Sequence, residues 1–312
     1  MSRLWPMVFM GTPHSAAATL EGLLAGPDPV VGVVTRPDRP AGRGQRTESS
    51  PVRKVAERHQ KPVLTPERIR DSRFLETLKD WGPELIVVVA YGRILPRSVL
   101  ELPTQGCINV HYSLLPKYRG AAPMTWALAK GEEKTGVTTM RLVEQMDAGP
   151  LLLQEEVSVA TDETTTSLEA KLTPVGARLL LETIRGLKEG RITERLQRDA
   201  EATYAPILKK DDGQIDWNQP AKEMERRVRA FTPWPSAYTH WKGKLIKVHR
   251  AELINKEVGA APGEVVRADG VALWVATGQG VLDLQEVQQE NRKRMPAAEF
   301  VRGARIKVGE KF

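Results

Sequence analysis

Residues 85–120 read LIVVVAYGRILPRSVLELPTQGCINVHYSLLPKYRG, and their pattern indicates the fold class. Two short apolar runs within it, 85–90 and 107–111, have the length and the branched side chains of buried strands. Three further runs of this kind occur at 4–10, 30–35 and 137–142. Helical patterns lie between the runs, and this alternation predicts an α/β fold with a doubly wound, mostly parallel sheet. Ligands of such sheets bind beyond the carboxyl ends of the strands.

Helices are expected at 15–24, 51–58, 124–129 and 166–188. Pro51 and Pro123 stand where the second and third of these begin, which is a position that proline favours. A further helix is expected to begin at Thr65-Pro66, because a cap and a first-turn proline there precede the apolar residues Ile69, Phe74, Leu75 and Leu78.

Beyond Tyr204 the pattern changes to short apolar runs separated by turn residues. These runs lie at 245–249, 263–266, 271–276, 281–287 and 306–308. Short strands at such spacing predict a second, smaller domain with an OB-like β-barrel, a type that often binds nucleic acids. The expected organisation is a first domain over 1–189, a linker over 190–208 and the barrel over 209–312.

The composition is that of a folded globular protein, since 41% of the 312 residues are hydrophobic and 27% are charged. The longest strongly apolar run, 85–90, is far shorter than the roughly 20 residues of a transmembrane helix, so no membrane partner is expected. The single cysteine, Cys107, can form neither an internal disulfide nor a cysteine cage for a metal. A lone cysteine without a disulfide partner suits a reducing compartment, and the cytoplasm is therefore the expected location.

The net charge of +7 is concentrated towards the end of the chain. Residues 206–312 hold 19 of the 46 Lys and Arg but 14 of the 39 Asp and Glu. Such an excess can attract nucleic acid, although moderately basic domains often have no such partner, so charge alone does not favour one. The basic segment 36–51, RPDRPAGRGQRTESSP, is equally consistent with a mobile surface connection and with a loop whose arginines reach phosphate oxygens.

The turn after the first expected strand, Gly11-Thr12-Pro13-His14, does not form a nucleotide-binding motif. It lacks both the G-x-G-x-x-G pattern and the lysine of a P-loop. An enzyme that uses a nicotinamide cofactor or ATP is therefore disfavoured.

The densest group of polar residues lies around Asn109 and His111 at the end of the 107–111 run. Strand alternation puts both on one face and Val110 on the other. Asp147 stands in a later turn, Met146-Asp147-Ala148-Gly149-Pro150. Taken singly, such a histidine is more often structural and such an aspartate more often caps a turn. Together they can promote attack on a carbonyl, through a donor for the oxyanion, an imidazole that takes a proton and a carboxylate that orients it.

Metal coordination explains this group less well, and no metal is expected. No second histidine lies nearby in the sequence, and an amide is a poor ligand for zinc.

The run 109–120, NVHYSLLPKYRG, together with 146–150, MDAGP, resembles the signature of the folate-dependent formyltransferases. Other segments resemble the branch of this superfamily that acts on methionyl-tRNA: FMGTP at 9–13, PAGRG at 40–44, YAP at 204–206, IDW at 215–217 and RAFTPWP at 229–235. The resemblance spans almost the whole chain.

The resemblance implies a Rossmann-like catalytic domain that transfers the formyl group of 10-formyltetrahydrofolate to the α-amino group of methionyl initiator tRNA, for translation initiation. It implies Asn109, His111 and Asp147 as catalytic residues and a monomeric protein. Contacts to the folate are implied for Tyr91, Gly92, Ser113, Leu114, Leu115 and Pro116. An α-amino group titrates near pH 8 in simple models, so it can attack the formyl carbon directly, with no covalent enzyme intermediate.

The same resemblance gives the basic segment a partner. Arg43 is expected near the acceptor end of the tRNA, and the β-rich domain is expected to bind tRNA electrostatically. The further tRNA contacts expected are Arg36, Arg39, Arg46, Lys209 and Lys210.

Two other functions remain possible alternatives: formyl transfer to a different substrate, and RNA binding without catalysis. A formyltransferase acting on an amino sugar nucleotide can share the two-domain plan and the same three catalytic residues, but the basic 36–51 segment argues against it. A protein that binds RNA without catalysis is disfavoured because Asn109, His111 and Asp147 are all present.

Overall fold

The computed structural model describes residues 3–41 and 46–312. The chain folds into two compact units. The first comprises residues 1–123, 134–158 and 169–206, and the second comprises 124–133, 159–168 and 207–312. Two short segments from the middle of the sequence therefore pack with the carboxyl-terminal residues.

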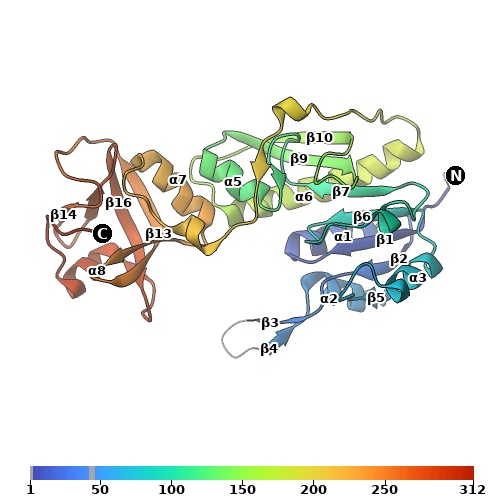
Figure 1. Ribbon diagram of the computed structural model, residues 1–312, viewed down its shortest axis with the longest axis horizontal. Helices are drawn as coiled ribbons and strands as arrows, with labels where there is room; N and C mark the ends of the chain where they lie inside the picture. Colours follow the sequence, from blue (N-terminus) through green and yellow to red (C-terminus); the bar gives the residue numbers. More distant parts are fainter. Residues whose placement is uncertain (1–2, 42–45) are drawn as a thin grey trace. The chain divides into compact units, whose positions relative to one another are not determined.

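The first unit is built on a seven-stranded sheet with the strand order β10-β9-β7-β6-β1-β2-β5 (Figure 1). Its strands are β1 (Met7–Gly11), β2 (Val30–Val34), β5 (Val63–Leu64), β6 (Leu85–Val89), β7 (Cys107–His111), β9 (Lys134–Arg141) and β10 (Leu151–Ser158). The five strands β5, β2, β1, β6 and β7, which are neighbours in this order, all run parallel. Strand β9 is antiparallel to β7, and β10 is antiparallel to β9. The predicted, mostly parallel α/β sheet is thus confirmed.

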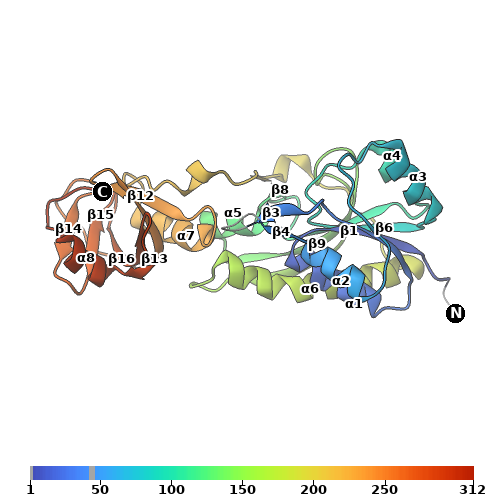
Figure 2. The same cartoon turned by 90° about the horizontal axis from the view of Figure 1, so that it is seen from below.

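Helices cover both faces of this sheet. Figure 2 shows α1, α2 and α6 on one face and α3 and α4 on the other. The helices of the chain's first 190 residues are α1 (His14–Leu24), α2 (Pro51–Arg58), α3 (Ser72–Asp80), α4 (Arg97–Leu100), α5 (Pro123–Lys130) and α6 (Thr165–Lys188). Every residue of β1, β6 and β7 is buried, as expected for central strands covered on both sides.

The helix expected to begin at Thr65-Pro66 begins instead at Ser72, so that prediction is wrong. Asp71 caps it, because its side chain accepts a hydrogen bond from the Arg73 N–H at 3.0 Å. The carbonyls of Pro66 and Glu67 accept hydrogen bonds from Arg93 Nη1 at 3.1 and 2.8 Å. This long-range contact holds the 65–70 segment outside the helix.

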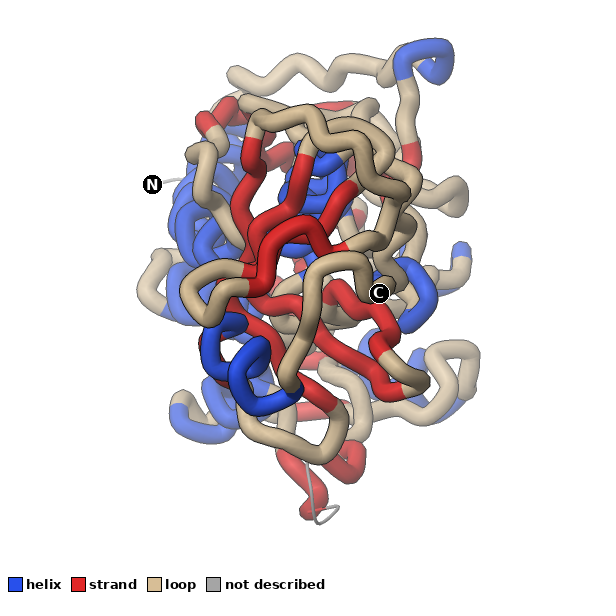
Figure 3. The backbone as a smooth tube through the Cα atoms, turned by 90° about the vertical axis from the view of Figure 1, so that its left-hand side faces the viewer, coloured by secondary structure: helices blue, strands red, loops and turns tan. Residues whose placement is uncertain are grey.

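The second unit contains an antiparallel sheet with the order β12-β13-β16-β15-β14, to which β17 adds by pairing with β16. Figure 3 draws the strands in red and the helices in blue. Its strands are β12 (Ala237–Trp241), β13 (Lys244–Ile254), β14 (Val265–Ala268), β15 (Leu273–Ala276), β16 (Val281–Gln289) and β17 (Met295–Pro296). Two helices, α7 (Ala221–Phe231) and α8 (Ala297–Ala304), pack on it. A second domain of short antiparallel strands is therefore confirmed.

The strand expected at 306–308 is absent from the described structure. Residues 306–308 follow α8, whose carboxyl-terminal cap, Arg305, has a left-handed conformation. Ile306 is buried in the core of the second unit, whereas Val308 is exposed. The run is apolar because Ile306 packs into the core of the second unit, and it does not form a strand.

Candidate active site

The site lies at the carboxyl end of β7, where Asn109 and His111 share a face of the strand. Asn109 pairs in register with Val88 on β6, and His111 pairs with Thr138 on β9. Both side chains are more than nine-tenths buried. Because β6 and β7 are parallel neighbours, Tyr91 and Gly92, which follow β6, lie at the same edge of the sheet.

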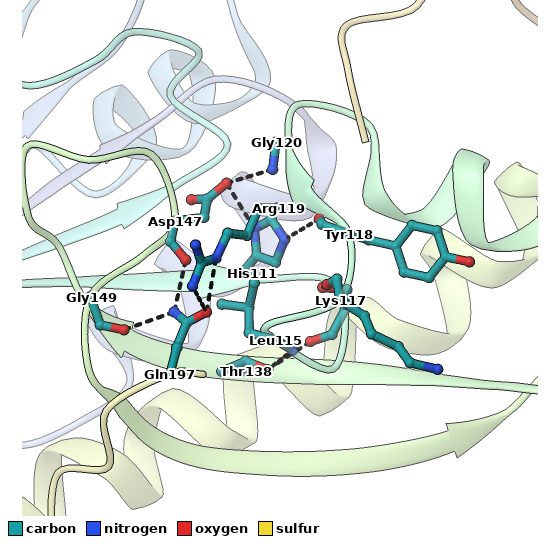
Figure 4. A network of polar contacts seen from close by, with 11 residues as sticks. His111, Leu115, Lys117, Tyr118, Arg119, Gly120, Thr138, Asp147, Gly149 and Gln197 are labelled. Carbon is teal, nitrogen blue, oxygen red and sulfur yellow. Dashed lines mark hydrogen bonds and ion pairs between the residues drawn. The ribbon is translucent and has the colours of Figure 1, made fainter. Parts of the chain in front are cut away.

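His111 and Asp147 are brought together across the loop that follows β7 (Figure 4). Nε2 of His111 lies 2.9 Å from the carbonyl oxygen of Tyr118. A carbonyl oxygen can only accept, so Nε2 carries a hydrogen and donates it. Nδ1 of His111 lies 3.8 Å from Oδ2 of Asp147, which is too long for a hydrogen bond but suits an ion pair when the ring is protonated. The two ring nitrogens therefore have different roles.

Asp147 is held from two sides. Its Oδ2 accepts a hydrogen bond from the backbone N–H of Gly120 at 2.7 Å, and its backbone is left-handed, with φ of +49°. The side-chain amide of Gln197 donates to the carbonyl oxygens of Asp147 and Gly149, at 2.7 and 2.8 Å. Asp and Asn adopt this backbone region more readily than other non-glycine residues, and supporting contacts maintain it.

Gly120 is in turn fixed by two short strands, β8 (Arg119–Gly120) and β11 (Tyr204–Ala205), which pair in parallel. Its φ is +125°, and a Cβ there would lie 2.4 Å from the carbonyl oxygen of Ala205. Glycine is therefore required, and it brings the backbone N–H to Asp147.

The side-chain amide of Asn109 makes no hydrogen bond to any residue within 3–41 and 46–312. A largely buried amide in this state is available to a bound substrate, to which it can donate. Asn109 and the His111 ring thus supply polar groups to one side of the sheet edge.

The loop expected to contact folate has a fixed backbone. Thr138 Oγ1 donates to the Ser113 carbonyl at 2.6 Å and accepts from the Leu115 N–H at 3.2 Å. The Leu115 carbonyl accepts from Gln154 at 2.8 Å, and the Pro116 carbonyl accepts from the Thr203 N–H at 3.3 Å. The Ser113 hydroxyl donates to the Lys117 carbonyl at 2.6 Å, so it serves the loop itself.

Arg36, expected at the tRNA, lies against Gly92, expected at the folate. Its Nη1 is 3.3 Å from the position of a Cβ on Gly92, which has φ of +76°. The Tyr91 side chain is buried, and burial raises the pKa of its hydroxyl, an effect that the charges of Arg93 and Arg36 reduce. The structure therefore places Arg36 with the residues that follow β6.

The other expected tRNA contacts are separated between the two units. Arg39 and Arg46 begin two short strands that pair antiparallel, β3 (Arg39–Ala41) and β4 (Arg46–Glu48), within the segment read from sequence as a loop. Arg43 lies outside the described residues. Lys209 and Lys210 are exposed and belong to the second unit, where Lys210 begins a short 3-10 helix.

Sequence reasoning missed four residues that build the site: Arg119, Gly120, Thr138 and Gln197. Arg119 and Gly120 belong to the quoted 109–120 motif, but the motif did not indicate what either residue does. Gln197 lies in a polar linker with no pattern that marks it.

Within the described part of the chain, no three His, Cys, Asp or Glu side chains gather as a metal site would require. None of its helices is long and apolar enough to cross a membrane.

Comparisons with known proteins show which family this chain resembles. Residues 6–184 match the formyl transferase family, and residues 207–305 match the formyl transferase C-terminal domain. The methionyl-tRNA formyltransferase of Desulfotalea psychrophila is 49% identical over 300 residues, which cover 96% of this chain and 93% of that protein. That of Citrifermentans bemidjiense is 45% identical over 303 residues, covering 97% and 95%.

Solved structures show the same fold at low identity. WlaRD, a sugar 3N-formyl transferase, superposes with a TM-score of 0.67 at 15% identity, over 93% of this chain and 100% of that one. HypX from Aquifex aeolicus in complex with tetrahydrofolic acid gives a TM-score of 0.63 at 19% identity, over 99% of this chain and 49% of that one.

Proposed function

Because this chain belongs to the methionyl-tRNA formyltransferase family, we propose that it transfers the formyl group of 10-formyltetrahydrofolate to the α-amino group of methionyl initiator tRNA. The products are formylmethionyl-tRNA, which starts translation, and tetrahydrofolate. Likeness over nearly the whole chain to proteins named for this activity supports the substrates. The observation that carries the chemistry is the cluster of Asn109, His111 and Asp147 at the carboxyl edge of the sheet.

The reaction proceeds by direct attack. The neutral amine of the methionyl group forms a bond to the formyl carbon, and the bond from this carbon to N10 of the folate breaks. One proton leaves the amine and one is gained by the folate nitrogen. Negative charge develops on the formyl oxygen, where the Asn109 amide and protonated His111 donate hydrogen bonds, each donor contributing about 10²–10³-fold in rate.

The tautomer of His111 decides which ring nitrogen serves the substrate. Since Nε2 donates to the Tyr118 carbonyl, Nδ1 is the ring nitrogen that remains for the substrate. Nδ1 also faces the Asp147 carboxylate, whose Oδ2 lies 3.8 Å away. This arrangement suits a histidine that stabilises the oxyanion while Asp147 assists proton movement.

Neither the Cys107 thiol nor the Ser113 hydroxyl is available as a nucleophile for a covalent intermediate. Burial raises the pKa of the Cys107 thiol to about 12, and its sulfur faces the Val99 carbonyl at 3.8 Å. The Ser113 hydroxyl donates within its own loop. Both observations support direct attack by the amine.

For the folate, we propose a pocket formed by Tyr91, Gly92 and the 113–116 loop. The loop's backbone is held by Thr138 and Gln154, so it offers a preformed surface to a planar ring. Its members are Ser113, Leu114, Leu115 and Pro116.

For the tRNA, we propose contacts from Arg39, Arg43 and Arg46 of the basic segment 36–51, with Arg36, Lys209 and Lys210 as further cationic groups. Arg43→Ala is expected to weaken discrimination for initiator tRNA and lower kcat/KM. Unchanged discrimination and kcat/KM in this variant would remove Arg43 from the proposal.

We further propose that the protein acts as a monomer in the cytoplasm. Sedimentation of the purified protein would test the first point, and fractionation of cells would test the second.

The decisive experiment measures transfer of labelled formyl from 10-formyltetrahydrofolate to methionyl initiator tRNA. Methionyl elongator tRNA is the control substrate, and His111→Ala is the control variant. Initiator-selective transfer that is lost in the variant is expected. Failure of folded wild-type protein to transfer formyl to tRNA, with transfer to a nucleotide-linked amino sugar instead, would favour the alternative substrate class.

A further inference from the structure

The turn that carries Asp147 is held by a side chain from the linker, 50 positions further along the chain. Gln197 donates one N–H of its amide to the Asp147 carbonyl and the other to the Gly149 carbonyl, at 2.7 and 2.8 Å (Figure 4). Residues 193–200 are exposed except for Gln197, which is partly buried. The one inward-facing residue of this stretch thus contacts the turn with Asp147.

The orientation of the Gln197 amide is determined by its partners. Oε1 accepts two hydrogen bonds from Arg119, from Nε at 3.0 Å and Nη2 at 2.9 Å. Carbonyl oxygens at the opposite end can only accept, so the NH₂ group must face Asp147 and Gly149. Exchanging the two ends of the amide would break all four contacts.

Arg119 anchors this arrangement. Its side chain is 2% exposed, which makes it one of the largest fully buried side chains of the protein. Its Nη2 also donates to Asp199 at 2.8 Å, two residues after Gln197. A buried guanidinium needs such partners, because an unpaired charge in the interior is strongly destabilising. Arg119 therefore couples the linker to the loop that follows β7.

The turn needs this support because of its backbone. Asp147 is left-handed, and Gly149 has no room for a side chain, since a Cβ there would lie 1.9 Å from the Arg141 carbonyl oxygen. The Gly120 N–H fixes only the carboxylate. Gln197 fixes the carbonyls of Asp147 and Gly149. It thereby fixes the direction in which the Asp147 carboxylate points toward His111.

We propose that Gln197, with its amide oriented by Arg119, is a positioning residue that holds the Asp147 carboxylate at the distance from His111 that formyl transfer requires. This inference rests on the proposed function in one respect, since it takes Asp147 as catalytic. It adds a role for the linker, which supplies part of the active site's support as well as connecting two domains.

Two substitutions separate the contacts of Gln197. Gln197→Met keeps the length of the side chain and removes all its hydrogen bonds. Gln197→Glu keeps an oxygen that can accept from Arg119. Its second oxygen replaces the NH₂ group, so it cannot donate to the Asp147 and Gly149 carbonyls. Both substitutions are expected to lower kcat for formyl transfer by about 100-fold, the loss that a misplacement near 1 Å can cause. KM for 10-formyltetrahydrofolate and for methionyl initiator tRNA is expected to stay within about twofold, since neither substrate is proposed to touch Gln197.

The matched control is Leu196→Ala, which alters the neighbouring linker residue, whose side chain is 84% exposed. Its kcat is expected to equal that of the wild type. Thermal unfolding of each variant shows whether it is folded at the assay temperature. Wild-type kcat in Gln197→Glu would overturn the proposal, because this variant retains the Arg119 partner and loses only the link to the turn.

A double-mutant cycle with Asp147→Asn distinguishes positioning from a general loss of stability. If Gln197 acts through the carboxylate, Gln197→Met is expected to change kcat less than twofold in the Asp147→Asn background, measured by single turnover with excess enzyme. A full reduction that persists in this background would overturn the proposal. Inactivity of wild-type protein on methionyl-tRNA would instead overturn the proposed function, so the two failures are distinguishable.

Discussion

The carboxylate of Asp147 faces Nδ1 of His111 at 3.8 Å, while the opposite ring nitrogen donates to the Tyr118 carbonyl at 2.9 Å. The imidazole is thus held at one edge by a neutral acceptor and faces an anion at the other. Under the proposed mechanism, Nδ1 is therefore the ring nitrogen that serves the substrate. The negative charge of Asp147 is then expected to matter more for activity than its shape.

Asp147→Asn tests this dependence on charge. An asparagine oxygen can still accept the Gly120 N–H, so the turn is expected to keep its structure. Without the negative charge, kcat for formyl transfer is expected to fall by about 10²–10⁴-fold, the range for loss of a proton-transfer group. Steady-state kinetics with both substrates measures it, and an undiminished kcat would show that the carboxylate's charge is not needed.

Asn109→Ala is expected to separate activity from stability. Because the amide makes no hydrogen bond within the described residues, its removal breaks no hydrogen bond among them. Loss of one oxyanion donor is expected to lower kcat by about 10²–10³-fold. The thermal unfolding midpoint is expected to stay close to that of the wild type. A large drop in that midpoint with little change in kcat would mean that Asn109 is structural.

Gly120→Ala is expected to destabilise the first unit and lower kcat. The new Cβ would lie 2.4 Å from the Ala205 carbonyl oxygen, at a φ of +125° that other residues rarely adopt. Strain and displaced backbone together are expected to cost about 3 kcal/mol in the free energy of unfolding. Urea unfolding measures the loss. Gly259→Ala, which has no atom within 4 Å of its added Cβ, is the control and is expected to change little.

Cys107 is expected to be unreactive in the folded protein. Burial raises its pKa from 9.0 to about 12, with the Arg141 charge partly opposing, so below pH 9 the thiolate is about 1000-fold scarcer than in the unfolded chain. At pH 8, alkylation is expected to be far slower in native than in urea-unfolded protein. Equal rates in the two states would show that the thiol is accessible.

The same pKa shift predicts a pH dependence of stability. A raised folded-state pKa means that the native protein holds this proton more tightly, so the contribution is complete below about pH 9 and is lost progressively towards pH 12. The free energy of unfolding of the wild type, relative to Cys107→Ala, is therefore expected to fall by at most about 1.4 kcal/mol per pH unit in this range. A constant difference between the two proteins would contradict the shift.

Local sequence alone predicted much of the fold. The five apolar runs of the first 142 residues are all strands, and α2 has the predicted bounds, Pro51–Arg58, with Ser50 as its cap. These features depend on side-chain periodicity and on capping within a few residues, both of which can be read along the chain. The start of α3 could not be read this way, because Arg93 binds the carbonyls that a helix from residue 65 would have used.

The chemical groups of the candidate site can be read along the chain: an amide and an imidazole two residues apart on one strand, and a carboxylate in a later turn. Their mutual arrangement depends on long-range contacts of the folded protein. The tertiary structure places Asp147 opposite Nδ1 of His111, brings Gly120 to the carboxylate, and draws Gln197 from the linker to the carbonyls of the turn. These contacts join residues 27 to 50 positions apart. They form because the sheet order places β7 beside β9 and because β11, which follows Gln197, pairs with β8. Periodicity and capping are short-range properties of the chain, and they contain no information about such distances.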